Sequence, residues 1–183
     1  LKSTRPAEIS IGYLPLLKQN PSFRNLWYGQ VISELGNWVN SIALYALILQ
    51  LTGSGMAMAA AMMAKLLPMV IISPFAGVVI DRVDRRTVLI ASDICRCFTV
   101  LCFLIVESRE DLWLVYALTL FEVALTGFFE PARSAIIPSI VKKSHLVTAN
   151  AISGATWSIM LTLGAALGGF VVSLFGVKVA FIL

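Results

Sequence analysis

Charged residues are scarce in this sequence: they make up 13% of its 183 residues, whereas hydrophobic residues make up 58%. A soluble domain carries about 25% charged residues, and the mean hydropathy here is +0.88. There is one histidine, and the three cysteines, Cys95, Cys97 and Cys102, share one apolar run without a second cluster at metal-ligand spacing. We interpret them as helix packing residues. The composition predicts an integral membrane protein without a metal site.

The sequence also lacks the short motifs of enzyme chemistry. It has no nucleophile elbow, no phosphate-binding glycine loop and no His or Cys pair at metal spacing, so we expect neither an enzyme nor a bound cofactor. The formal net charge is +4, but the basic residues occupy short loops between apolar runs and form no continuous face. This pattern indicates membrane topology and argues against a nucleic-acid partner.

Five apolar runs are long enough to cross a bilayer, and a sixth has just begun when the sequence stops. We predict helices at about 23–51, 56–80, 87–106, 112–137 and 146–175, and the start of a sixth at 177–183. Asn20-Pro21-Ser22 is a helix start signal, so residues 1–22 are predicted to be a cytoplasmic lead segment and residues 23–183 a transmembrane bundle. Because a spanning helix needs about 20 residues, we expect the sixth helix to continue beyond Leu183.

Basic residues are distributed unevenly between the two sides of these predicted helices. If the N-terminus is cytoplasmic, nine basic residues fall on the inner side and two on the outer side. The inner set is Lys2, Arg5, Lys18, Arg24, Arg82, Arg85, Arg86, Lys142 and Lys143, and the outer set is Arg109 and Lys178. This bias predicts a multi-pass protein with a cytoplasmic N-terminus.

The densest charge cluster separates the second apolar run from the third. It follows Gly77 and contains Asp81, Arg82, Arg85 and Arg86. Such a cluster cannot lie in hydrocarbon, so we place it at the cytoplasmic surface. An acid at the C-terminal end of a helix opposes the helix dipole and needs compensation, which favours a specific contact for Asp81 over a simple topology anchor.

Shifting the sequence by 92 residues aligns the end of the second run with the end of the fifth: residues 77–81 fall on residues 169–173. The period is three helices, which is typical of the three-plus-three inverted repeats of secondary transporters. Gly164, Gly168 and Gly169 are small residues at a spacing that favours close helix packing.

Three stretches carry a family resemblance. Residues 77–86, with the pattern Gly-x-x-x-Asp-Arg-x-x-Arg-Arg, resemble the signature loop of the major facilitator superfamily. Residues 23–30, and residues 128–138 followed by Ala149-Asn150-Ala151, are similar to drug and siderophore exporters typified by macrolide efflux and enterobactin export proteins. The resemblance implies the N-terminal six-helix half of a carrier in a bacterial-type inner membrane, with the C-terminal half absent from this sequence.

The resemblance also implies a function. It implies a secondary active transporter that exports amphipathic or hydrophobic small molecules by alternating access, with residues 77–86 as a conformational latch. Some family positions differ, because Asn37, Val123 and Ala165 stand where an acid, an arginine and a proline are common. Protons therefore remain an open choice of coupling ion. A lysophospholipid flippase of the same superfamily and a membrane scaffold or receptor without transport are the alternatives.

Several polar residues lie inside the predicted spans, where a charge costs about 2.5–3.5 kcal/mol and needs a partner or a cavity. Glu34, Asn37 and Ser41 follow helical spacing, and Lys65 and Glu122 have similar predicted depth. These five are the candidate substrate or proton cavity, and we expect Lys65 and Glu122 to form an ion pair. Two further pairs have the spacing i and i+3 of structural ion pairs: Asp93 with Arg96, and Glu130 with Arg133.

Overall fold

The computed structural model describes residues 11–65, 77 and 82–183, and within this part the chain is helical without strands. The α-helices are α1 (Tyr13–Gln19), α2 (Pro21–Thr52), α4 (Arg85–Cys102), α5 (Leu112–Ile140), α6 (Leu146–Phe175) and α7 (Val177–Ile182). Residues 55–65 are also helical. Short 3₁₀ helices occur at Phe103–Ile105, Arg109–Asp111 and Lys143–His145.

Four helical segments of the described residues are long and apolar enough to cross a membrane: Pro21–Thr52, Arg85–Ile105, Arg109–Ile140 and Lys143–Phe175. They correspond to four of the five predicted spans. Most of the remaining predicted span, 56–80, lies outside the described residues. The count of five spans and the inverted repeat therefore stay predictions.

The ends of α2 follow directly from its sequence. The side-chain oxygen of Asn20 accepts a hydrogen bond from the Phe23 amide at 3.0 Å, and Pro21 occupies the first helical position, where its missing N–H costs nothing. At the other end, Gly53 adopts φ = 64°, a left-handed conformation that favours glycine. The predicted start signal is thus confirmed.

The structure differs from the sequence prediction at two places where a helix contains proline. The lead segment contains α1 despite Pro15, which lies in the first turn, where backbone N–H groups have no intrahelical partner. Helix α5 continues through Pro131 and Pro138 to Ile140, although we had expected it to end at Ile137. Transmembrane helices tolerate proline when their neighbours compensate for the lost bond.

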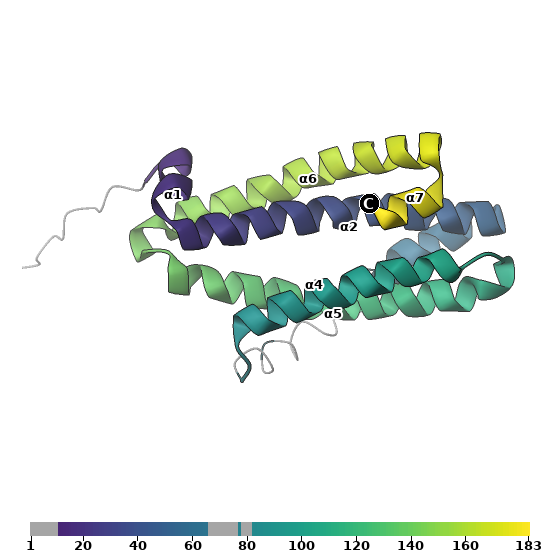
Figure 1. Ribbon diagram of the computed structural model, residues 1–183, viewed down its shortest axis with the longest axis horizontal. Coiled ribbons are helices and arrows are strands. Elements are labelled where there is room, and N and C mark those ends of the chain that lie inside the picture. Colours follow the sequence, from purple (N-terminus) through teal and green to yellow (C-terminus); the bar gives the residue numbers. More distant parts are fainter. Residues whose placement is uncertain (1–10, 66–76, 78–81) are drawn as a thin grey trace, which may run out of the picture.

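The helices pair side by side: α2 lies beside α6 and runs parallel to it, whereas α4 and α5 form an antiparallel pair (Figure 1). The starts of α2, α4 and α6 and the end of α5 therefore lie at one end of the bundle (Figure 1). We call this the basic end, since its connecting segments carry Lys18, Arg82, Arg86, Lys142 and Lys143.

Glycines allow α2 and α6 to approach closely. A Cβ added to Gly164 would lie 2.6 Å from Trp38 Cβ, and one added to Gly168 would lie 3.1 Å from Val39 Cα. These two predicted packing glycines therefore stand at a helix contact. Nothing lies within 4 Å of a Cβ added to Gly169, so a packing role for that glycine stays a prediction.

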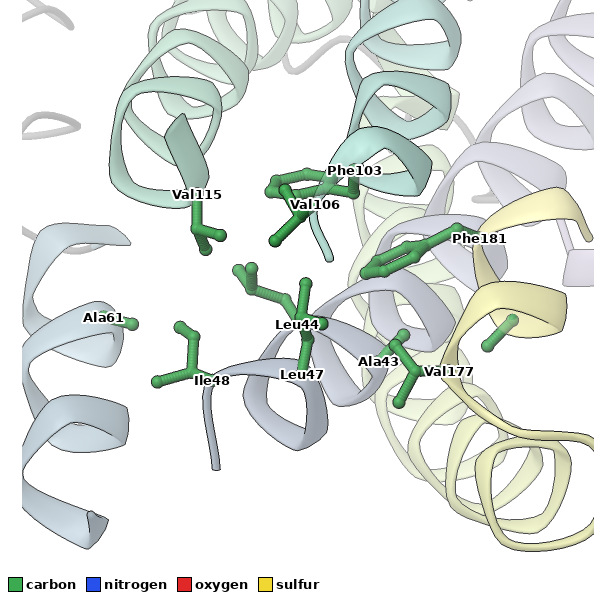
Figure 2. Close-up of a cluster of buried hydrophobic side chains, with 11 residues drawn as sticks. Ala43, Leu44, Leu47, Ile48, Ala61, Phe103, Val106, Val115, Val177 and Phe181 are labelled. Carbon is green, nitrogen blue, oxygen red and sulfur yellow. The ribbon is translucent and has the colours of Figure 1, made fainter. Parts of the chain in front are cut away.

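A hydrophobic core closes the end of the bundle opposite the basic end (Figure 2). It joins α2 to α4, α5, α7 and the helical residues 55–65 through buried aliphatic and aromatic side chains. Phe103 and Phe181 stack with ring centroids 5.2 Å apart, which fixes the short α7 against the end of the α4 segment. The polar residues of the next section lie between this core and the basic end.

Candidate functional site: buried polar groups between the helices

Two neighbouring residues of α2 hold the two charges that were expected to pair. The Asn40 side-chain amide donates to Glu122 Oε1 at 2.8 Å, and Lys65 Nζ donates to Ser41 Oγ at 2.8 Å. Within the described residues, Lys65 and Glu122 form no ion pair. The predicted direct pair is therefore wrong, because neutral side chains of α2 bind the two charged groups separately.

In this arrangement two buried side-chain oxygens accept no hydrogen bond from the described residues. Glu122 is 3% exposed, and its second carboxylate oxygen, Oε2, has no hydrogen-bond partner in the described part of the chain. The same holds for Asn40 Oδ1. An unsatisfied buried carboxylate oxygen is costly in a helix that crosses a membrane. Among the described residues, Glu122 Oε2 is therefore a buried acceptor that a further hydrogen-bond donor could satisfy.

A second polar layer lies nearer the basic end and joins α2 to α4 and α5. Asp93 Oδ1 accepts hydrogen bonds from Arg96 at 2.5 Å and from Ser33 Oγ at 2.9 Å. The Arg96 guanidinium also lies 4.7 Å from the centre of the Phe129 ring, a cation–π distance. Asp93 and Arg96 thus form the ion pair that their spacing predicted.

Glu130 and Arg133 form the second predicted ion pair, at 2.6 Å on α5. Arg133 Nε and Nη1 are buried and have no partner among the described residues. Glu34, which is 6% exposed, lies within Coulomb range of Glu130, Arg133 and Arg96. Acids and arginines from α2, α4 and α5 therefore share one charge cluster, in which Glu34 is buried and the others are partly buried.

The three residues of α2 that were predicted from their helical spacing to share one face point partly toward the other helices. Glu34 and Ser41 are buried and Asn37 is half-buried; the Asn37 backbone carbonyl accepts a hydrogen bond from Ser41 Oγ at 2.8 Å. Two further residues of α2, Ser33 and Asn40, bind charged groups of the site and are not among the predicted site residues. Ser33, Asn37 and Asn40 stand at i, i+4 and i+7, so a second helical pattern one residue away would have identified them.

A cavity of about 790 Å³ opens at the basic end between α2, α4 and α5. Its lining mixes apolar side chains with charged ones, among them Asp84, Arg85, Arg86, Asp93 and Arg133. The Arg85 guanidinium donates to the Ala135 carbonyl at 2.7 Å, so the first residue of α4 is tied to the last turns of α5.

The other residues of the predicted latch are less constrained. Arg82 and Arg86 are exposed, and Gly77 is helical and half-buried. An added Cβ at Gly77 would have open space. Asp81 lies outside the described residues, so the latch contact expected for it stays a prediction.

Membrane-length helices that bury charged and polar side chains between them define a polytopic membrane protein of the transporter type. The chain belongs to the transmembrane secretion effector family of the major facilitator superfamily, whose family model matches residues 11–183. The predicted superfamily and exporter branch are thereby confirmed.

Several curated relatives are similar over much of this chain. An uncharacterised transporter of this superfamily from Bacillus subtilis, YfiS, is 29% identical over 91% of the chain and 40% of its own length. Macrolide efflux protein A of Streptococcus pyogenes is 28% identical over 68% of the chain and 31% of its own length. The putative bacilysin exporter BacE of Bacillus subtilis is 29% identical over 81% and 37%, respectively.

The chain thus spans about 40% or less of the length of these relatives. No solved structure matches it. The family and these relatives indicate a family of transporters rather than one of enzymes.

Proposed function

We propose that this chain is the N-terminal half of a secondary active exporter that moves amphipathic or hydrophobic small molecules of the drug or siderophore type out of the cell. The observation that carries the proposal is Glu122, a buried carboxylate whose Oε2 has no partner in the described residues. The printed names of two relatives, a macrolide efflux protein and a putative bacilysin exporter, support export as the direction.

Alternating access needs a site that opens to each side in turn. Glu122 and Asn40 are the candidate binding groups, with Lys65 held one residue further along α2 by Ser41. A carboxylate oxygen without a donor favours a substrate that brings a hydrogen-bond donor or a positive charge. Glu34 and Asn37 extend this candidate site toward the basic end.

The basic end is proposed to be the cytoplasmic one, in a bacterial-type inner membrane, because basic residues concentrate in its connecting segments. There, Asp81, Arg82, Arg85 and Arg86 would hold the cytoplasmic gate closed when the carrier faces outward. The bond from Arg85 to the Ala135 carbonyl supports this role, since it joins the start of α4 to α5, the helix that carries Glu122.

Protons are the coupling ion that the buried acids favour. Val123 occupies the position of the arginine common in proton-coupled relatives, so Glu34 and Glu122 are the acids proposed to bind the proton. A carboxylate among buried charges can exchange a proton as its surroundings open to water.

The lysophospholipid flippase is the second candidate, favoured by the cavity at the basic end. This cavity combines Arg86 and Arg133 with the apolar side chains of Leu89, Ile90 and Phe129. Such a lining suits a ligand with an anionic headgroup and an acyl chain.

Transport by the full-length protein in proteoliposomes distinguishes these candidates. We expect uptake of a macrolide or a siderophore into inside-out vesicles, driven by a pH gradient and reduced at least tenfold by Glu122→Gln. Glu110→Gln, an exposed acid at the opposite end, is the matched control. Transport of lysophospholipid alone would select the flippase, and no transport of either class would favour a scaffold or receptor.

A further inference from the structure

Helix α1 lies at the basic end of the bundle (Figure 1). Three separate contacts attach it there. Leu16 is 1% exposed and packs in a cluster with residues of α2, α5 and α6. Before α1, the Ile11 carbonyl accepts a hydrogen bond from Thr148 Oγ1 at 2.9 Å. After α1, the side-chain amide of Asn20 donates a hydrogen bond to the Ile140 carbonyl at 2.7 Å. The helix is therefore fixed in place relative to the ends of three spanning helices.

The apolar face of α1 is wider than its contact with the bundle. At about 100° per residue, Leu16, Tyr13, Leu17 and Leu14 form one continuous arc of about 160°. Lys18, Pro15 and Gln19 form the opposite arc. Within this arc Leu16 is buried and Leu17 is half-buried against the same cluster, whereas Tyr13 is 61% and Leu14 is 69% exposed.

We propose that α1 lies in the membrane–water interface at the basic end, with Tyr13 and Leu14 inserted into the lipid and Lys18 facing the headgroups and water. An amphipathic helix binds this region when its apolar face enters the acyl boundary. Tyrosine is enriched there because its ring is apolar and its hydroxyl is polar. The proposal goes beyond transport and does not depend on the proposed function.

Lipid is the occupant that the surroundings of α1 favour. The helices to which α1 is attached cross the membrane, so the apolar arc continues their lipid-facing surface. At the start of α6, Val147 is 79% exposed and precedes Thr148, which binds the segment before α1. Lys18, Lys142 and Lys143 at the same end complement an anionic lipid surface.

Spin labels on the two faces of α1 test this placement. Single cysteines replace Leu14 or Gln19, which lie about 140° apart around the helix, in the full-length protein, in a background without other cysteines, and the labelled protein is reconstituted into vesicles containing anionic lipid. Accessibility to oxygen, which concentrates in the lipid, is compared with accessibility to a water-soluble nickel complex. Tyr13 and Lys18 give a second matched pair at the same separation, and all four side chains are exposed, so the substitutions remove no core contact.

We expect oxygen to dominate at positions 13 and 14, and the nickel complex to dominate at positions 18 and 19. If positions 14 and 19 are equally accessible to the nickel complex, α1 lies in water and the proposal is wrong. If position 14 is accessible to neither reagent, another protein segment or a second copy covers this face, which also overturns it. Transport is not measured, so the result is independent of the proposed export.

Discussion

Glu122 illustrates how α2 accommodates charge inside the bundle. One of its oxygens accepts a hydrogen bond from Asn40 and the other has no partner in the described residues. Consecutive residues of α2 therefore serve two different helices, since Asn40 binds α5 and Ser41 binds Lys65. The charged residues could be recognised from the sequence, but their partners could not, because an amide and a hydroxyl beside them compete for the same bonds.

Removing the donor of Glu122 should destabilise the protein. We expect Asn40→Ala to lower the free energy of unfolding by about 1–3 kcal/mol, because a buried carboxylate loses its hydrogen bond. The double variant Asn40→Leu with Glu122→Leu should recover most of this loss, since both partners become apolar. Unfolding in mixed micelles measures both, with Gln50→Ala, an exposed residue of α2, as the control. Additive effects of the two single substitutions would contradict the coupling.

Asp84 gives a pH-dependent contribution at the start of α4. The Thr87 amide and hydroxyl both donate to its carboxylate at 2.9 Å, and these bonds lower the pKa of Asp84 below its ordinary value. A lowered pKa means that the stabilisation is present above the ordinary aspartate pKa of about 4 and is lost as the pH falls through the lower value of the folded state.

We therefore expect Asp84→Ala to lower the unfolding temperature at pH 7, and the difference from the unchanged protein to disappear as the pH falls below the lowered pKa of Asp84 and its carboxylate becomes protonated. Thermal unfolding followed by circular dichroism at several pH values is the measurement. Glu110→Ala, an exposed acid that makes no side-chain hydrogen bond in the described residues, controls for net charge. A difference that persists unchanged at low pH would exclude this role of the carboxylate.

At the scale of helices, the contact between α2 and α6 depends on the absence of side chains at two positions. The atom nearest an added Cβ at Gly164 is the Cβ of Trp38, and the Leu35 carbonyl oxygen follows at 3.2 Å. Neither atom is the flexible end of a side chain, so the helices would have to move apart.

We expect Gly164→Ala to destabilise the protein by about 1–3 kcal/mol through overpacking. Gly154→Ala on the same helix is the matched control, because nothing lies within 4 Å of its added Cβ, and alanine favours helix by up to about 1 kcal/mol. Unfolding of the two variants under the same conditions compares them directly. Equal stability of the two variants would show that α2 and α6 do not pack at Gly164.

The helices themselves could be predicted well from the sequence. Apolar runs and the Asn20-Pro21 signal gave α2 and α6 nearly to the residue, because length, hydropathy and capping act locally. Helix α1 was missed because a seven-residue helix has no strong pattern of its own and is held by Leu16 in a cluster formed by distant residues. The open surroundings of Gly169 could not be foreseen either, since spacing alone does not say which small residues meet a partner.

At the scale of the whole molecule, residues 81–86 before and at the start of α4 are the proposed cytoplasmic gate. We expect Asp81→Asn or Arg85→Ala in the full-length protein to leave membrane insertion intact and to reduce export at least tenfold. Arg85 binds the Ala135 carbonyl, so its loss removes a contact between the start of α4 and α5. Export from cells is measured alongside the amount of protein in the membrane.

Lys143→Ala is the control for the latch, because Lys143 is an exposed basic residue of the same end. If Arg85→Ala exports at the rate of Lys143→Ala, the charge cluster of residues 81–86 serves topology alone. Loss of export in the latch variants only would support a specific role in gating.

The central claim is that α2 lines a cavity that opens to the cytoplasm and binds substrate, and labelling of a cysteine at position 34 tests it most directly. Glu34→Cys in the full-length carrier is treated with a membrane-impermeant thiol reagent from the cytoplasmic side, with and without substrate. Ile32→Cys, a 73% exposed position of the same helix that should face lipid, is the control and should not react. We predict labelling at position 34 that falls when substrate is added; no labelling at this position in any state would place Glu34 in a closed structural contact and contradict the claim.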